Sequence, residues 1–324
     1  MHAFVITEFG GPECLEMQVL PDPAPQSGHV LIAVKAFGLN RAELYFRSGA
    51  WGDVARVSGI ECVGTVIADP QGDHAEGDKV IALMGGMGRT INGSYAQLVS
   101  VPSTNVVAIN SKLSWAQLAA IPESYATAWA CLNDNLSVAK GQTLLIRGAT
   151  SALGRAAMNI AVRAGVKVIG TTRRDEGFGV IKNAGATPVL EKTDLSESLL
   201  SEFGPVDAVL DIVGNQTIVD SLASTRSGGK VCLVGFLGGG APIVDFNPLT
   251  QMPSGVQFSF FASAFVFGTP DFPLAKIPFQ ELVDDVEKGL YDARPAKEFA
   301  FDELPEAHRL MEDNRANGKL VVRV

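Results

Sequence analysis

A run of small residues in the middle of the chain has the composition of a phosphate-binding loop. Leu144-Leu145-Ile146 leads into Gly148-Ala-Thr-Ser-Ala-Leu-Gly154, and Arg155 to Arg163 then follows a helical pattern. Small residues let backbone N–H groups approach a pyrophosphate, and a helix N-terminus adds partial positive charge. The order strand, loop, helix therefore predicts a dinucleotide site. The predicted cofactor contacts in this loop are Ser151, Ala152, Leu153 and Gly154.

The loop departs from the Gly-x-Gly-x-x-Gly pattern of such sites. Ala149 and Ser151 occupy the first two glycine positions, and Gly154 alone keeps the third. The motif is therefore weak when it stands by itself. A strand-helix junction without a ligand is the alternative interpretation of the segment.

The residues after the next apolar run favour one form of the cofactor. This run, Val166 to Thr172, ends at Arg173 and Arg174, where an enzyme that uses NAD carries a carboxylate for the ribose 2′-hydroxyl. Two cations beside Thr172 suit a 2′-phosphate, so the sequence predicts NADPH over NADH. The alternative is that both arginines pair with the acidic residues Asp175 and Glu176.

The elements that would hold this loop form a repeating series. Five apolar runs, each separated by a stretch of helical period, predict a parallel sheet with helices on both faces. They are Leu144 to Ile146, Lys167 to Thr171, Pro188 to Leu190, Asp207 to Val213 and Lys230 to Gly235. Ligands bind at the carboxyl edge of such sheets. Gly214, Phe236 and Leu237 follow the fourth and fifth runs and are predicted cofactor contacts.

The two ends of the chain have a different rhythm. The first 110 residues contain short apolar runs broken by Gly, Pro and Asp, which predicts a partly open antiparallel barrel. The last segment mixes helical and strand-like pieces similar to that region. We therefore expect an α/β protein of two domains: a barrel domain made of residues 1–120 and 263–324, and a dinucleotide-binding domain, 121–262, built as a doubly wound parallel sheet.

Composition excludes several classes of protein. With 324 residues, 47% hydrophobic and 19% charged, the chain is compact and globular. Its net charge of −9 argues against nucleic acid as a partner. The four cysteines and four histidines are scattered, so neither a zinc module nor a disulfide scaffold is predicted. No secretory signal or membrane span is predicted, and we expect a cytoplasmic location.

Several segments in the right order resemble one family along essentially the whole chain. They are Gly38 to Gly49, Gly59 to Val66, Gly93 to Gln97, Ile121 to Trp129, the phosphate loop, Asp211-Ile-Val-Gly214, Glu306 to Arg309 and Gly318 to Val321. The chain resembles the medium-chain dehydrogenase/reductase superfamily, and within it the zinc-independent, zeta-crystallin-like quinone oxidoreductases. That resemblance implies a GroES-like barrel domain beside a Rossmann domain.

The same resemblance implies catalysis without a metal. Zinc-dependent relatives place Cys, His and Cys where this chain has Asn40, Ile60 and Glu123, and carboxylates do not replace that set for a borderline-soft ion. An acceptor that is already electrophilic needs no Lewis acid. The implied reaction is hydride transfer from NADPH to a quinone.

The resemblance also assigns residues to a nicotinamide and substrate cleft. The implied catalytic residues are Tyr45, Asn40 and Glu43, and the implied substrate-binding residues are Trp51, Arg47 and Phe261. Thr127 matches a position that contacts the nicotinamide side of the cofactor, and Lys319 is expected to reach a cofactor phosphate. From spacing alone, residues 40–51 are equally a polar helix with a surface Arg-Glu pair, and Lys319 is equally a solvated lysine.

Five phenylalanines crowd one short stretch before the C-terminal segment. They are Phe258, Phe260, Phe261, Phe265 and Phe267. Such a run is typical of a core or an interface. In the resembling family a strand here pairs across a dimer, so we expect a homodimer.

Two alternatives for the function stay open. One keeps the enzyme but changes the acceptor to an enone or enoyl thioester, which the pocket shape decides. The other is a protein of a different class, which binds NADPH and catalyses nothing. In each case the expected partners are small molecules.

Overall fold

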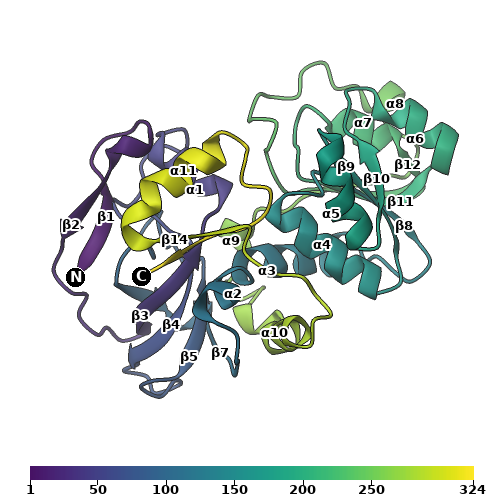
Figure 1. Cartoon of the computed structure of the whole chain (residues 1–324). Helices are drawn as coiled ribbons and strands as arrows, with labels where there is room; N and C mark the ends of the chain where they lie inside the picture. Colours follow the sequence, from purple (N-terminus) through teal and green to yellow (C-terminus); the bar gives the residue numbers. More distant parts are fainter. The chain divides into compact units, whose positions relative to one another are not determined.

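The computed structural model describes all 324 residues and divides into two compact units. The barrel unit comprises Met1–Ala126 and Ser263–Val324, and the sheet unit comprises Thr127–Ala262 (Figure 1). The boundary at 126 falls inside helix α3 (Pro122–Ala130). No helix is long and apolar enough to cross a membrane.

The barrel unit is built on a curved sheet of seven strands whose order is β14-β15-β3-β4-β5-β7, with β6 also paired to β3. Its strands are β3 (His29–Gly38), β4 (Glu61–Ala68), β5 (Lys79–Leu83), β6 (Leu98–Pro102), β7 (Val106–Ala108), β14 (Lys297–Ala300) and β15 (Leu320–Arg323). The hairpin β1 (His2–Ile6) and β2 (Leu15–Val19) pairs separately. The last strand of the chain thus pairs with β3, which is why the C-terminal segment belongs to this unit.

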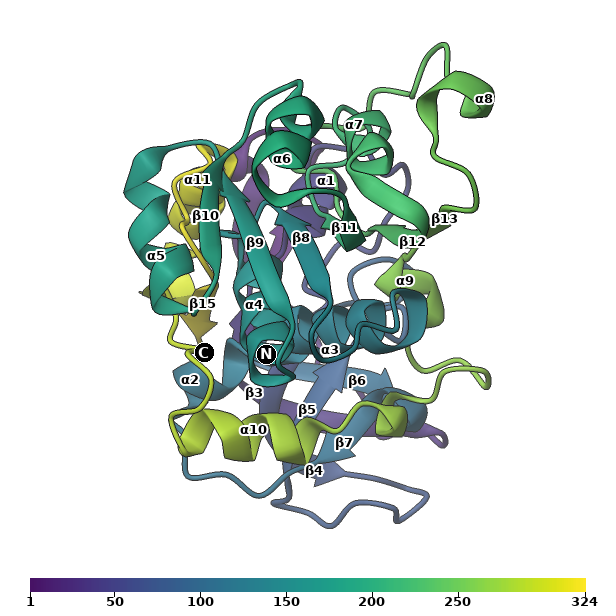
Figure 2. The same ribbon diagram turned by 90° about the vertical axis from the view of Figure 1, so that its right-hand side faces the viewer.

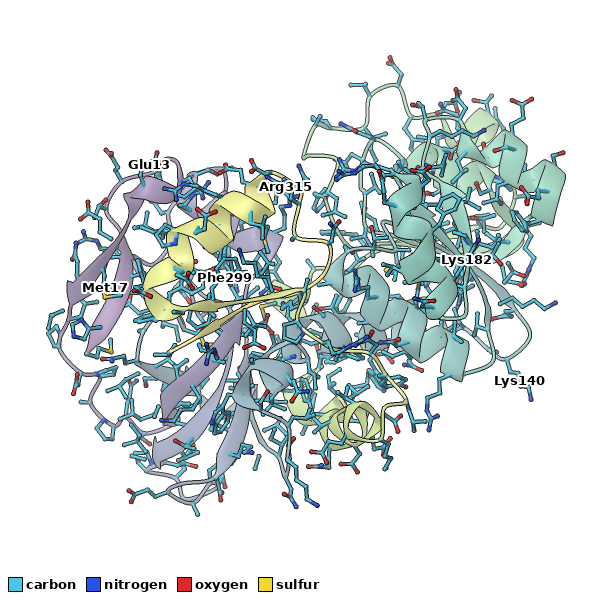
Figure 3. All side chains as sticks on the ribbon, in the orientation of Figure 1. Glu13, Met17, Lys140, Lys182, Phe299 and Arg315 are labelled. Atoms are coloured by element: carbon cyan, nitrogen blue, oxygen red, sulfur yellow. The ribbon has the colours of Figure 1, made fainter.

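Short helices close the barrel unit. They are α1 (Arg41–Arg47), α2 (Trp115–Ala119), α9 (Ser263–Val266), α10 (Phe279–Glu287) and α11 (Leu304–Glu312), with 3₁₀ turns η1 (Pro12–Cys14), η2 (Ser103–Asn105), η5 (Leu274–Lys276) and η6 (Phe301–Glu303). The core includes Phe37 stacked on Tyr95, with ring centroids 4.8 Å apart. Phe299 of β14, labelled in Figure 3, is buried in the same core.

The sheet unit contains six parallel strands in the order β10-β9-β8-β11-β12-β13 (Figure 2). Their bounds are β8 (Thr143–Arg147), β9 (Lys167–Thr172), β10 (Thr187–Leu190), β11 (Val206–Asp211), β12 (Thr225–Leu233) and β13 (Gln257–Phe260). The helices are α4 (Ala152–Arg163), α5 (Phe178–Asn183), α6 (Leu195–Phe203), α7 (Ile218–Ala223) and α8 (Pro248–Gln251), with the π-helix η3 (Cys131–Asn135) and the turn η4 (Asp175–Gly177).

Alternation along the strands decides which helices cover each face of this sheet. Leu145, Ile169 and Val209 pack with residues of α6 and α7 in one core cluster. Gly170, one residue along from Ile169, faces Met158 of α4 and Ile181 of α5. The two faces are therefore covered by different helices, as a doubly wound sheet requires.

The fold class predicted from the sequence is confirmed, with shifts at several element ends. The run predicted over Asp207 to Val213 ends at Asp211, because the Asp211 carboxylate accepts the N–H groups of Val213 and Gly214 and turns the chain. The count of five sheet strands was wrong, because β13 adds a sixth along β12.

Candidate functional site

The phosphate loop is shaped by bonds within its own backbone. Gly148 has a φ of +82°, and Gly154 lies so close to it that a Cβ on Gly154 would be 2.5 Å from the Gly148 carbonyl oxygen. Ser151 caps α4, since its hydroxyl accepts the N–H of Gly154 at 3.0 Å. The one glycine kept from the motif is thus the one that lets the helix pack against the loop.

The start of α4 has the donors that an anion needs. Ala152 and Leu153 occupy the first turn of this twelve-residue helix, where backbone N–H groups have no intrahelical acceptor. Both residues are half-buried. The cradle of small side chains and the helix N-terminus fit a pyrophosphate group.

The other predicted cofactor residues of the sheet unit gather at the same carboxyl edge. A Cβ on Gly148 would lie 3.2 Å from Leu237 Cδ1, and one on Gly214 would lie 3.2 Å from Phe236 Cα. Thr172 ends β9 and is buried, and Arg173 and Arg174 follow it as exposed side chains. The structure thus brings the loop, Gly214, Phe236 and Leu237 together, with the arginine pair at the end of the neighbouring strand.

The Asp211-Ile-Val-Gly214 segment owes its shape to a buried carboxylate. Asp211 accepts hydroxyl groups from Thr217 and Ser221, at 2.9 and 2.6 Å, besides the two backbone N–H groups at its turn. Burial raises the pKa of Asp211, and the hydrogen bonds from Ser221 and Gly214 oppose that rise. This carboxylate fixes the loop that carries Gly214.

A second group of predicted residues lies in the barrel unit, around the start of α1. Asn40 precedes α1, and its side chain donates to Glu61 Oε1 at 2.8 Å. Lys319 donates to Asn40 Oδ1 at 2.6 Å and pairs with Glu61 Oε1 at 2.5 Å. Glu61 also accepts the N–H of Glu123 at 2.7 Å. The three side chains Asn40, Glu61 and Lys319 therefore form one closed cluster.

Gly38 is the glycine that makes room for this cluster. A Cβ there would lie 2.2 Å from Lys319 Cε and 2.6 Å from Glu61 Oε1. The contact between Lys319 and Glu61 was not predicted from the sequence. The sequence did contain one indication of it: Glu61 stands in a buried strand, and a buried carboxylate needs a cation as its partner.

Three of the predicted catalytic or substrate residues are placed differently from what we expected. Glu43 is fully buried, and its two carboxylate oxygens accept the N–H groups of Asn40 and Ile60, at 2.5 and 3.1 Å. Arg47 is 1% exposed and pairs with Glu312 at 2.9 Å, so the interpretation of residues 40–51 as a helix with a surface Arg-Glu pair is wrong for this arginine. Phe261 directly follows β13 and is 6% exposed, and its N–H donates to the carbonyl oxygen of Leu233 on β12. All three are held inside their units by packing, and the catalytic role of Glu43 and the substrate roles of Arg47 and Phe261 stay predictions.

Two of the remaining predicted residues have partly solvent-exposed side chains, and a third lies in α3, the helix in which the chain passes from one unit to the other. Tyr45 is half-buried on α1. Trp51 is 42% exposed, and its ring stacks on Phe265 with centroids 6.2 Å apart. Thr127 is buried within α3. Asn40, Tyr45 and Trp51 thus remain the accessible candidates of the barrel unit.

A buried chain of titratable groups lies behind Glu43. Tyr95 Oη and His308 Nε2 are 3.0 Å apart, and burial, with a smaller effect of the Glu43 carboxylate, raises the pKa of Tyr95. Burial raises the pKa of Glu43 to about 8, against the lowering effect of the Asn40 N–H and the Lys319 charge. Burial, with a smaller effect of the Arg47 charge, lowers the pKa of His308 to about 3. His308 is therefore neutral at ordinary pH.

The residues at the positions of the zinc ligands do not fit a zinc ion. Asn40 is bonded to Glu61 and Lys319, Ile60 is apolar and buried, and Glu123 is a hard oxygen ligand. No group of three or more His, Cys, Asp or Glu side chains is placed to bind a metal ion. We derive no step through a metal.

Comparisons with known proteins agree with this architecture. Residues 26–111 match the family "Alcohol dehydrogenase GroES-like domain", and residues 152–275 match "Zinc-binding dehydrogenase". The human protein "Quinone oxidoreductase" is 28% identical over 99% of this chain and 97% of its own length. The chain therefore belongs to the medium-chain dehydrogenase/reductase superfamily, in its quinone oxidoreductase branch.

Two solved structures have the same fold as this chain. A mycobacterial protein in complex with NADPH is 26% identical and superposes with a TM-score of 0.88, each chain being covered in full. A quinone oxidoreductase of Pseudomonas syringae has the same TM-score at 24% identity, covering 100% of this chain and 99% of its own. Because the second structure is less than 25% identical to this chain, its similarity shows the fold alone.

The buried Glu43 predicts a pH dependence of stability. Its pKa in the folded chain, about 8, lies above the ordinary glutamate value of 4.5, so the folded state holds the proton to a higher pH than the unfolded state does. The stabilisation is full below the lower value and is lost as the pH rises through the higher one. Between pH 6.5 and 8 the free energy of unfolding should fall by about 1.5 kcal/mol more in the wild type than in Glu43→Gln.

Denaturant unfolding of both proteins at the two pH values measures this difference. Glu13→Gln, which changes an exposed acid of the same unit (Figure 3), serves as the control and should keep the wild-type slope. Equal slopes for wild type and Glu43→Gln would contradict the assignment.

Proposed function

We propose that this protein is an NADPH-dependent reductase that transfers a hydride to a quinone-type acceptor without a metal. The observation that carries the proposal is the loop Gly148–Gly154 at the start of α4, together with the two exposed arginines that directly follow the next strand, β9. The human relative named a quinone oxidoreductase and the mycobacterial structure that holds NADPH support it.

The cofactor would lie along the carboxyl edge of the sheet unit. The N–H groups of Ala152 and Leu153 would face its pyrophosphate. They lie beside Ser151, the N-cap residue of α4, and Gly154, whose N–H the Ser151 hydroxyl accepts. Thr172, Arg173 and Arg174 would bind the 2′-phosphate, because guanidinium groups match phosphate geometry. Gly214, Phe236 and Leu237 would line the remainder of the site, with Thr127 toward the nicotinamide.

The chemistry divides between the cofactor and the protein. When bound, NADPH supplies the hydride, and a quinone is electrophilic enough to accept it without a Lewis acid. The chain positions the reactants and excludes water. In the barrel unit, Asn40 is held by Glu61 and Lys319, so its orientation is fixed. Tyr45 offers a phenolic donor and Trp51 a flat wall for an aromatic acceptor.

Turnover with several acceptors tests the reaction. The purified protein should oxidise NADPH when 1,4-benzoquinone or 9,10-phenanthrenequinone is present, and it should do so faster than with an α,β-unsaturated ketone or an enoyl thioester. The decay of the reduced nicotinamide absorbance measures each rate. Faster decay with the enone or thioester would replace the quinone by that acceptor class. Binding of NADPH with no decay above blank for any acceptor would leave a non-catalytic binding protein.

The arginine pair predicts the choice of cofactor. Arg174→Ala should raise the Michaelis constant for NADPH about tenfold or more, because a charged hydrogen bond to the 2′-phosphate is lost, and should spare the constant for NADH. Lys167→Ala removes an exposed cation at the opposite end of the same strand and is the matched control. If the wild type prefers NADH, or uses both equally, the 2′-phosphate assignment is wrong.

We also propose that two copies pair along β13. This strand is the last of the sheet, and it exposes Phe258 and Phe260 at 41% and 55%. Phe261 N–H bonds to Leu233 on β12, and alternate residues of a parallel strand face the same neighbour. The N–H groups of Phe258 and Phe260 therefore point to the free edge, which is an unprotected template for a second strand.

Removing one outward N–H should separate the copies. The wild type should be a dimer by light scattering at micromolar concentration, and Phe260→Pro should be a monomer that keeps its fold, since proline is tolerated at an edge. Phe265→Ala changes a phenylalanine of the barrel unit that is 60% exposed and should stay dimeric. A monomeric wild type would refute the proposal.

A further inference from the structure

Arg147, the last residue of β8, is a buried charge placed directly before the phosphate loop. Its side chain is 0% exposed, and all of its N–H groups face acceptors. It pairs with Glu191 through Nη2 and with Asp220 at 2.6 Å through Nη1, and further bonds reach the Lys192 and Thr217 carbonyl oxygens at 3.2 Å. Burial would lower the pKa of Arg147, but Glu191 and the other acids raise it.

Glu191 links Arg147 to β9 through hydrogen bonds. Its Oε2 accepts the hydroxyl proton of Thr171 at 2.6 Å. A hydroxyl carries a single proton, so the Thr171 oxygen presents its lone pairs to the loop, and it accepts the N–H of Gly148 at 3.0 Å. The Thr171 carbonyl oxygen accepts the next N–H, that of Ala149, also at 3.0 Å. One residue of β9 therefore fixes the first two amides of the phosphate loop.

The same glutamate is tied to the strand that carries the arginine pair. The Glu191 N–H donates to the Thr172 carbonyl oxygen at 2.8 Å, and Arg173 and Arg174 follow Thr172 directly. Both segments proposed to bind the cofactor thus meet at Glu191, whose carboxylate is held by the buried guanidinium of Arg147.

We infer that Arg147, Glu191 and Thr171 are positioning residues for the dinucleotide. They act through the backbone of Gly148 and Ala149 and through the end of β9, and they touch no reacting atom. The inference rests on the proposed NADPH binding. If it holds, loss of the Thr171 hydroxyl weakens cofactor binding and leaves turnover at saturating NADPH unchanged, because the reacting groups lie elsewhere.

The rival explanation is that the network stabilises the sheet and nothing more. The opposite edge of the same sheet offers a matched comparison. Asp207 accepts the N–H of Thr143, at the start of β8, at 2.8 Å and pairs with Arg226 at 2.7 Å. Asp207 thus ties β8 to a neighbouring strand and an arginine just as Glu191 does, but at the edge away from the loop.

The test compares Thr171→Val, Thr171→Ser and Asp207→Asn. The dissociation constant for NADPH is measured by titration of the nicotinamide fluorescence, together with kcat for a quinone and the melting temperature. Thr171→Val should bind NADPH about tenfold more weakly, with kcat at saturating NADPH within twofold of the wild type. Thr171→Ser retains the hydroxyl and should restore binding. Asp207→Asn should melt earlier and bind as the wild type does.

Each other outcome is decisive. If Thr171→Val melts earlier but binds NADPH as tightly as the wild type, the network is merely structural and the inference is overturned. Should Thr171→Val fail to fold, Glu191→Gln replaces it, because one amide oxygen cannot hold both Arg147 and Thr171; it should show the same weaker binding, and wild-type binding overturns the inference. A wild type that binds no NADPH refutes the proposed function itself.

Discussion

The pairing of buried ions shapes both units of the protein. Taking a guanidinium or carboxylate out of water costs several kcal/mol unless it is paired and hydrogen-bonded. Arg147 meets the requirement with acceptors from two segments, the residues after β10 and the helix α7. Since a planar guanidinium accepts little distortion, those segments cannot shift independently of β8.

The barrel unit satisfies the same requirement with a lysine. Lys319 is 5% exposed and lies just before β15, whereas Glu61 begins β4 and is 0% exposed. Their ion pair joins strands that lie on opposite sides of β3 in the sheet order. The pair also holds Asn40, so the charge that fixes the sheet also orients an amide.

Local patterns made the fold predictable, and distant pairs limited the prediction of the site. The strand, loop and helix around Gly148 are contiguous, from Thr143 to Arg163, and their hydrophobic period is a local property. Lys319 and Glu61 are 258 positions apart, and no periodicity brings them together. Arg147 could have been noticed as a charge ending an apolar run, but its partners 44 and 73 positions away could not. Glu43 and Arg47 lie on a helix whose polar residues indicated a solvent-exposed face, but tertiary packing buries both side chains.

The two buried acids of the barrel unit show how environment separates identical groups. Glu61 faces the Lys319 ammonium, whereas Glu43 has no cation within bonding distance and its pKa is raised to about 8. Behind these acids, Tyr95 Oη and His308 Nε2 lie 3.0 Å apart, and burial keeps the His308 ring neutral by lowering its pKa to about 3. A neutral imidazole carries one proton. With that proton on Nε2, the ring donates to Tyr95, and the buried Nδ1, which has no hydrogen-bond partner, is an unsatisfied acceptor. With the proton on Nδ1, Tyr95 donates to Nε2, and Nδ1 is an unsatisfied donor instead. The unpartnered ring nitrogen therefore costs free energy in either tautomer.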